Sequence, residues 1–144
     1  MSPQGPLHAA LVRLLTKLLA AAFEGCEVFA DRPVTLAERN QSSPNVCVVR
    51  GELRDYLHKH PRQEDLVLMV EVVDSSLAYD LGVKAEVYAR AGVPLYWVLD
   101  VQGRSLHVHE GGRPDGTWRS VRVLGNQDNT GLASTTVDDL FPQT

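Results

Sequence analysis

One acidic residue inside an apolar run constrains this chain more than any other feature. The run from Leu66 to Val73, LVLMVEVV, is rich in Val and Leu and is bounded by polar segments. This pattern is typical of a central strand that is buried on both faces. Glu71 lies within it, and a buried carboxylate is costly unless a cation, a metal ion or hydrogen-bond donors compensate its charge. The fold must therefore bring such a partner to Glu71.

The segments after this strand predict a crossover connection. Asp74-Ser75-Ser76 offers N-cap residues, a helix is expected from about Tyr79 to Ala91, and Gly92 follows as its C-terminal stop. Gly82 weakens that helix by about 1 kcal/mol relative to alanine. A second buried strand is expected over Leu95–Asp100. A helix between two such strands makes them parallel neighbours joined by a right-handed crossover.

The remaining segments predict another helix and further strands. Leucines recur at helical spacing from Leu7 to Phe23, ahead of Gly25. Residues 51–65 read as a polar loop, and the apolar pair Leu140-Phe141 is expected to pack back onto the body. Further strands are expected over Cys26–Ala30, Val34–Ala37, Val46–Arg50, Ser105–Glu110 and Trp118–Leu124. This order predicts an α/β or α+β fold with a mixed sheet, in one domain spanning residues 1–144.

Composition bounds the class of protein. An apolar share of 44% with 22% charged residues is globular. The sequence has no apolar run near the roughly 18 residues that a membrane span needs, and no signal peptide is recognised. Cys26 and Cys47 look like reduced core residues, so a cytoplasmic protein without a membrane partner is expected. The net charge of −4 argues against a dedicated non-specific nucleic-acid binder. The basic clusters within 50–62 and 104–122 are more typical of solvated loops than of phosphate sites.

Spacing places an amine near Glu71. Along the strand, Glu71 and Val73 face one side and Val72 the other. On the following helix one stripe consists of Asp80, Lys84 and Tyr88. An adjoining apolar stripe, expected to pack onto the sheet, consists of Val83, Val87 and Ala91. Two interpretations stay open: a structural ion pair between Glu71 and Lys84, or a metal-assisted phosphodiester site where the lysine stabilises developing charge or helps activate water.

These residues carry a family resemblance. The runs E-V-x-x-S from Glu71, D-x-x-x-K-x-x-x-Y from Asp80 and G-V-P-x-Y-W-x-x-D from Gly92 resemble the Uma-type family of restriction-endonuclease-like proteins. That family belongs to the PD-(D/E)xK nuclease superfamily. The resemblance spans roughly Leu7 to Phe141 and is dense over Leu66–Asp100. It implies a restriction-endonuclease-like core, in the order αβββαβ, with additional C-terminal strands.

The resemblance also implies a site. In the superfamily an aspartate after a proline and an acid on the next strand hold Mg²⁺ or Mn²⁺, and a lysine completes the site. Glu71 matches the second acid, and Lys84 matches the lysine where Uma-type members carry it, on the helix. The expected Pro-Asp reads Pro44-Asn45 here, so Asn45 would offer the metal a neutral oxygen. Asn45 and Glu71 are thus the implied metal ligands, and Glu71 and Lys84 the catalytic residues. Asp74 could substitute for the missing charge only if the chain turns after the strand.

Other polar groups are weaker candidates. His58-Lys59-His60 lies in a polar loop without a third metal ligand. His107 and His109 share a strand face, with Glu110 next in the sequence, but no fourth metal ligand is recognised. Ser75-Ser76 is better explained by helix capping than by nucleophilic catalysis. Tyr96-Trp97 is expected to serve packing.

Two functions therefore stay open. The first is a Mg²⁺-dependent endonuclease-like phosphodiesterase acting on DNA, with Asn45 as a weakened ligand. The second is a catalytically inactive nuclease-fold domain that binds nucleic acid or another protein. Asn45 and the acidic net charge favour the second. Because nuclease-like folds often act as dimers, the resemblance also makes a homodimer an expectation.

Overall fold

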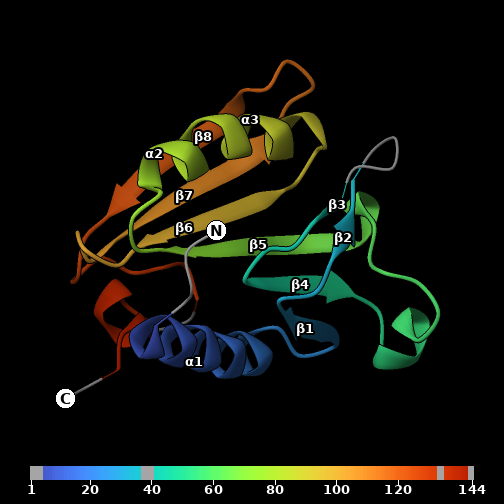
Figure 1. The fold of residues 1–144 in the computed structure, drawn as a ribbon, viewed down its shortest axis with the longest axis horizontal. Coiled ribbons are helices and arrows are strands. Elements are labelled where there is room, and N and C mark those ends of the chain that lie inside the picture. The colour runs from blue at the N-terminus through green and yellow to red at the C-terminus, as the bar shows by residue number, and fades with distance from the viewer. Residues whose placement is uncertain (1–4, 37–40, 133–134, 143–144) are drawn as a thin grey trace.

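A six-stranded mixed sheet runs through the molecule, which we describe from a computed structural model over residues 5–36, 41–132 and 135–142 (Figure 1). Its strand order is β1-β4-β5-β6-β7-β8. The strands are β1 (Cys26–Ala30), β4 (Val46–Arg50), β5 (Leu66–Val73), β6 (Leu95–Asp100), β7 (Ser105–Gly112) and β8 (Trp118–Leu124). β5 and β6 are parallel, and the other neighbouring strands are antiparallel. The predicted mixed sheet with a parallel crossover pair is thus confirmed.

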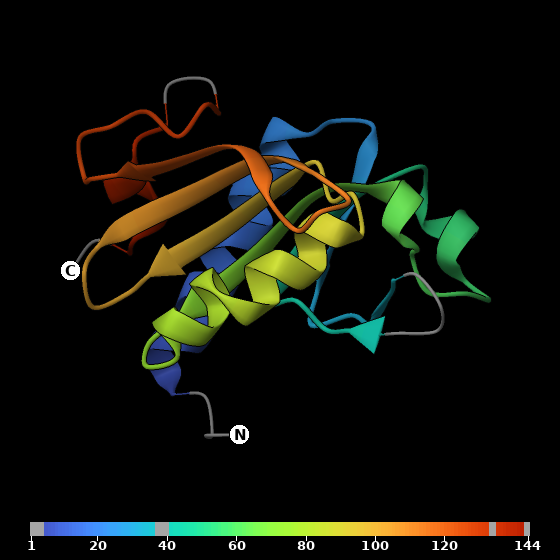
Figure 2. The same ribbon diagram turned by 90° about the horizontal axis from the view of Figure 1, so that it is seen from above.

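Helices cover both faces of the sheet and create two apolar cores. Helix α1 (Pro6–Ala22) packs on one face through Leu11, Leu15 and Leu19. Helices α2 (Leu77–Leu81) and α3 (Val83–Arg90) lie on the other face, over the central strands (Figure 2). β5 is buried on both sides, since Val70 and Val72 belong to the first core and Met69 and Val73 to the second. The alternation expected along this strand is therefore confirmed.

The connection between β5 and β6 differs from the single helix that the sequence predicts. Gly82, with φ −103° and ψ −92°, leaves the helical region and separates α2 from α3. Its missing side chain suits the break, because a Cβ there would lie 3.0 Å from the Ala78 carbonyl oxygen. The expected apolar stripe is consequently wrong: the side chains of Val83 and Val87 are exposed, and α3 packs through Ala85, Tyr88 and Ala89.

Three smaller differences concern short elements. β2 ends earlier than expected, at Val34–Thr35, and Ala37 lies outside the described residues. β2 pairs with β3 (Gln41–Ser42), which the sequence did not predict, in a small separate sheet. The loop at 51–65 contains two 3₁₀ turns, Leu53–Tyr56 and Gln63–Asp65.

The chain end and the cysteines behave as expected. The 3₁₀ helix Val137–Leu140 and Phe141 bury their apolar side chains in the core on the α1 side. Both cysteines are free, and burial raises the pKa of the Cys47 thiol to about 12. Among the helices described, none is long and apolar enough to cross a bilayer.

The contact between β7 and α3 requires a glycine, which gives a test of the packing. A Cβ on Gly112 would lie 2.8 Å from the Ala89 Cα atom and 2.9 Å from the carbonyl oxygens of Ala89 and Val93. These are backbone atoms, so we expect Gly112→Ala to lower the free energy of unfolding by about 1–3 kcal/mol through overpacking. Urea denaturation measures this change.

Gly125→Ala is the matched control. Among the described residues, a Cβ at Gly125 would meet the Asp128 carboxylate alone, at 3.8 Å, which is ordinary van der Waals contact. We expect a change within about 0.5 kcal/mol. Equal unfolding midpoints for the two variants would contradict the close approach of β7 to α3.

Candidate functional site

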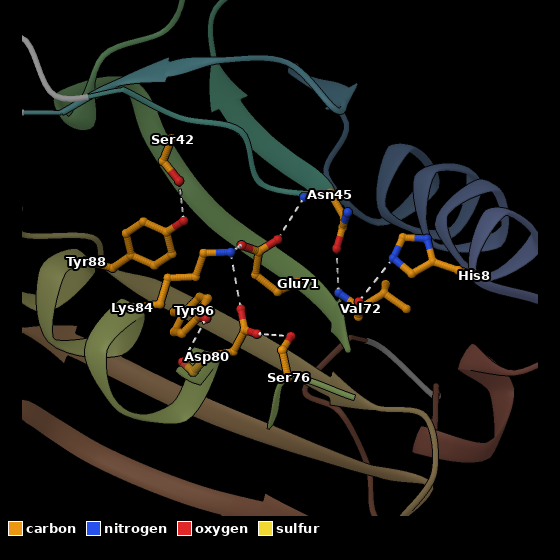
Figure 3. A network of polar contacts seen from close by, with 10 residues as sticks. All are labelled: His8, Ser42, Asn45, Glu71, Val72, Ser76, Asp80, Lys84, Tyr88 and Tyr96. Atoms are coloured by element: carbon orange, nitrogen blue, oxygen red, sulfur yellow. Dashed lines mark hydrogen bonds and ion pairs between the residues drawn. The ribbon is translucent and has the colours of Figure 1, made fainter. Parts of the chain in front are cut away.

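Glu71 obtains its partners from two different elements (Figure 3). It lies in the C-terminal half of β5, facing α2 and α3, and is 3% exposed. Its Oε2 atom forms an ion pair with the Lys84 ammonium at the first turn of α3. Its Oε1 atom accepts a hydrogen bond, 3.0 Å long, from the Asn45 backbone N–H. The structure thus brings Glu71, Lys84 and the Pro44-Asn45 segment together, as the sequence predicted.

Asn45 owes its position to the register of the sheet. Val46 at the start of β4 pairs with Val70 in the antiparallel ladder, which sets the preceding Asn45 beside Glu71. The Asn45 side chain turns away from the ion pair, and its Oδ1 accepts the Val72 N–H at 2.8 Å (Figure 3). The Val72 carbonyl in turn lies 3.1 Å from the His8 Nε2 on α1. Asn45 therefore stabilises the C-terminal end of β5 through hydrogen bonds to Glu71 and Val72. Its role as a metal ligand stays a prediction.

Asp80 is a second buried carboxylate of the site. It is 3% exposed, and its Oδ1 lies 3.2 Å from the Lys84 Nζ. Its Oδ2 accepts the Ser76 hydroxyl at 3.0 Å, and its backbone carbonyl accepts the buried Tyr96 hydroxyl at 3.0 Å. The sequence placed Asp80 on the right stripe, but its burial was not predicted. That burial could have been inferred from the spacing, because an acid four residues before an inward-pointing lysine lies on the same stripe of the helix.

The site therefore carries two carboxylates against one ammonium. Burial raises the pKa of Glu71, and the nearby charge of Asp80 adds to that rise, while Lys84 and the Asn45 N–H oppose it. Burial lowers the pKa of Lys84, but the charge and hydrogen bond of Glu71, together with the charges of Tyr88 and Asp80, outweigh it, so the pKa is raised. Lys84 thus stays protonated at neutral pH. Counted by formal charge, two carboxylates and one ammonium leave the group with one excess negative charge.

Lys84 connects this buried group to the surface. Its side chain is 29% exposed and opens into a hollow of about 340 Å³ between α3 and the small sheet. Tyr88 spans the hollow, because its hydroxyl forms a hydrogen bond with Ser42 on β3. The hollow is lined by Leu36, Gln41, Ser42, Tyr79, Lys84, Val87 and Tyr88. A ligand entering it would reach the ammonium first and the carboxylates behind it.

The weaker candidates lie elsewhere. Asp74 is exposed in the turn after β5, and the histidines of the 58–60 segment are exposed in their loop. His109 is buried, with its Nδ1 3.2 Å from the Tyr96 carbonyl, and burial lowers its pKa. Ser76 occupies an N-cap position, but its hydroxyl bonds to Asp80. Within the described ranges, no group of three or more His, Cys, Asp or Glu side chains is arranged to hold a metal ion.

The shared ammonium gives a test of the site's electrostatics. Lys84→Met removes the cation that both buried carboxylates share, so we expect the free energy of unfolding to fall by about 3 kcal/mol at pH 7. This is the lower end of the range for breaking a buried pair, because Lys84 keeps some solvent contact. Glu71→Gln should cost less, since Lys84 then still pairs with Asp80. Urea denaturation of the single and double variants measures the coupling between the two residues.

Arg90→Met is the matched control on the same helix. Arg90 pairs with Glu86 at the same i,i+4 spacing, but both side chains are more than half exposed. Such pairs contribute about 0.5 kcal/mol or less. If Lys84→Met costs no more than Arg90→Met, the two carboxylates do not depend on the ammonium.

Similar proteins exist for both the sequence and the fold. The sequence matches the Uma2 family, described as "Putative restriction endonuclease", over residues 1–141. A search of curated proteins finds no match. Among solved structures, the fold resembles that of a "putative nuclease belonging to DUF820" from Anabaena variabilis ATCC 29413, with a TM-score of 0.65. The two chains are 14% identical, and the likeness covers 98% of this chain and 83% of the other.

The two findings carry different weight. At 14% identity the structural likeness shows the fold alone, which is a nuclease-like fold. The family match and this fold together support a nuclease function. Because the match extends over nearly the whole sequence, the chain belongs to the Uma2 family of restriction-endonuclease-like proteins.

Proposed function

We propose that this protein is a Mg²⁺-dependent phosphodiesterase that cleaves DNA, with its active site at Glu71, Asp80 and Lys84. One observation carries the proposal: two buried carboxylates share a single ammonium behind an open hollow. Strongly perturbed ionisable groups in a hollow are characteristic of active sites. A phosphodiester brings negative charge to this ammonium, and a divalent cation would balance the carboxylates behind it.

The donor set suits a hard divalent cation. Mg²⁺ prefers oxygen ligands and is commonly bound by one or two carboxylates, with water and substrate phosphate completing the octahedron. Glu71 and Asp80 supply the carboxylates, and the excess negative charge favours a cation beside them. Asn45 would add its amide oxygen only if its side chain turned from Val72 toward Glu71, since Oδ1 accepts the Val72 N–H in this structure. When bound, such an ion polarises a phosphoryl oxygen and lowers the pKa of its water.

In this proposal Lys84 stabilises negative charge and does not act as a general base. Its raised pKa makes it a poor proton acceptor at neutral pH, so it does not activate the water as a general base. A protonated amine held between Glu71 and Asp80 can instead bind a non-bridging phosphate oxygen and stabilise the charge of the transition state. Of the two roles that the sequence left open for Lys84, the charge stabiliser is the one its surroundings support.

Cleavage assays test the proposal directly. We expect the purified protein to nick or cut DNA with Mg²⁺ or Mn²⁺ and to be inactive in EDTA. Glu71→Gln removes a metal ligand and should lower the rate by at least about 100-fold. Glu86→Gln is the control, because Glu86 forms an exposed ion pair on the same helix. Cleavage that persists unchanged in Glu71→Gln would refute the site.

A second function is an inactive nuclease fold that binds nucleic acid or another protein. The observation that favours it is the use of Asn45, whose side-chain oxygen is engaged by the Val72 N–H and carries no charge. Asn45→Asp separates the two functions, because an aspartate can keep that hydrogen bond while adding a negative charge beside Glu71. If charge alone is missing, the variant should gain Mn²⁺-dependent cleavage and a larger rise in Tm with Mn²⁺. If neither cleavage nor the Tm shift with Mn²⁺ increases, the missing charge at Asn45 does not explain an inactive site.

The raised pKa of Glu71 gives a pH dependence. Protons and the metal compete for the same carboxylate, so metal binding is lost when Glu71 becomes protonated. Because its pKa is raised above the ordinary value of 4.5, this loss should occur at a higher pH than for an exposed glutamate. At a Mg²⁺ concentration well below saturation, we expect kcat/KM to fall on the acid side with an apparent pKa above 4.5, and no descending limb from Lys84 near neutral pH. An acid limb at or below 4.5 would contradict the burial of the ionised group.

A further inference from the structure

The hollow beside Lys84 is lined by aromatic, aliphatic and polar side chains that the binding of a phosphate alone would not need. Tyr79 and Val87 stand at its rim with large exposed fractions, 54% and 43%, and the buried Leu36 forms part of the opposite side. Gln41 and Ser42 line it from β3 and carry amide and hydroxyl groups. The hollow thus combines an aromatic ring, aliphatic side chains and a few polar groups with a cation.

This combination matches the chemistry of a nucleotide. Bases stack on exposed aromatic side chains, and this stacking tolerates any base because every base has a π-face. The amide of Gln41 offers both a donor and an acceptor to a base edge. Lys84 lies in the same hollow, so a phosphate bound there would be covalently next to a nucleoside that contacts Tyr79.

The dimensions restrict the form of that nucleic acid. A volume of about 340 Å³ is at the small end of ligand pockets and suits a single nucleoside. Bases inside a duplex are stacked and cannot enter such a pocket unless they are extruded from the helix, which costs a few kcal/mol. Single-stranded DNA avoids that cost.

We propose that the hollow is a subsite for one unpaired nucleobase, stacked on Tyr79 beside the phosphate at Lys84, so that the preferred substrate is single-stranded DNA. This proposal rests on the proposed function, which assigns the binding of the substrate phosphate to Lys84. Its binding component can be tested without turnover. Tyr79 acts in it as a specificity-determining residue.

The test compares binding of one fluorescein-labelled oligonucleotide, single-stranded and as a duplex, by fluorescence anisotropy in EDTA. We expect the single strand to bind more tightly than the duplex. Tyr79→Ala should weaken single-strand binding about tenfold, the loss of one base–aromatic stack, and leave duplex binding unchanged. Tyr79→Phe keeps the ring and should bind like the parent. Because Tyr79 is largely exposed, neither variant should disturb the fold.

Val121→Ala is the control for an exposed apolar side chain away from the hollow, on the edge strand β8. It should leave both Kd values unchanged. Equal affinity of the parent for single strand and duplex, or unchanged single-strand binding in Tyr79→Ala, would overturn the subsite. So would a loss in Tyr79→Phe equal to that in Tyr79→Ala, since the ring would then not be the binding element.

Cleavage measured on the same oligonucleotides separates this inference from the proposed function. Selective, Tyr79-dependent binding without metal-dependent cleavage would support the subsite and refute the phosphodiesterase. Metal-dependent cleavage with equal rates for single strand and duplex, and no effect of Tyr79→Ala on KM, would support the phosphodiesterase and refute the subsite.

Discussion

The buried carboxylate of Glu71 is the constraint on which the rest of this structure depends. An ionised carboxylate on a strand covered on both faces requires compensation, and the fold supplies it from two directions. The antiparallel register of β4 and β5 presents the Asn45 N–H, and the crossover between β5 and β6 presents the Lys84 ammonium. The pairing of β4 with β5 and the position of α3 thus both supply partners to Glu71. The segment from β5 to β6 therefore determines the central part of the fold and also positions the site residues.

Much of this arrangement could be predicted from the sequence because it follows from local patterns. An unbroken apolar run predicts a central strand, as β5 and β6 show, and the polar helix-forming segment between them predicts a parallel crossover. The approach of Lys84 to Glu71 followed from strand alternation and helical spacing. Each of these predictions needs only the periodicity of one segment and the rule that apolar faces are buried.

The parts that the sequence did not predict depend on tertiary contacts. Gly82 leaves the helical region, so the spacing that holds within one helix no longer decides which residues of α3 face the sheet. Val83 and Val87 are consequently exposed, Ala85 and Ala89 are buried in their place, and Ala89 approaches Gly112 of β7 closely. The engagement of the Asn45 amide with Val72 likewise depends on the register between β4 and β5, which no local pattern specifies.

The burial of Asp80 bears on whether the ion pair serves structure alone. Burial is the main cause of the raised pKa of Glu71, and the charge of Asp80, whose carboxylate lies 3.2 Å from the same ammonium, adds to that rise. Hydrogen bonds from Ser76 to the Asp80 carboxylate and from Tyr96 to its carbonyl fix this acid in place. Two carboxylates that share one ammonium repel each other, and perturbed ionisable groups of this kind cluster at functional sites. The second carboxylate beside the same ammonium is what the proposed divalent cation would balance, and the proposal of a metal-binding site rests on it.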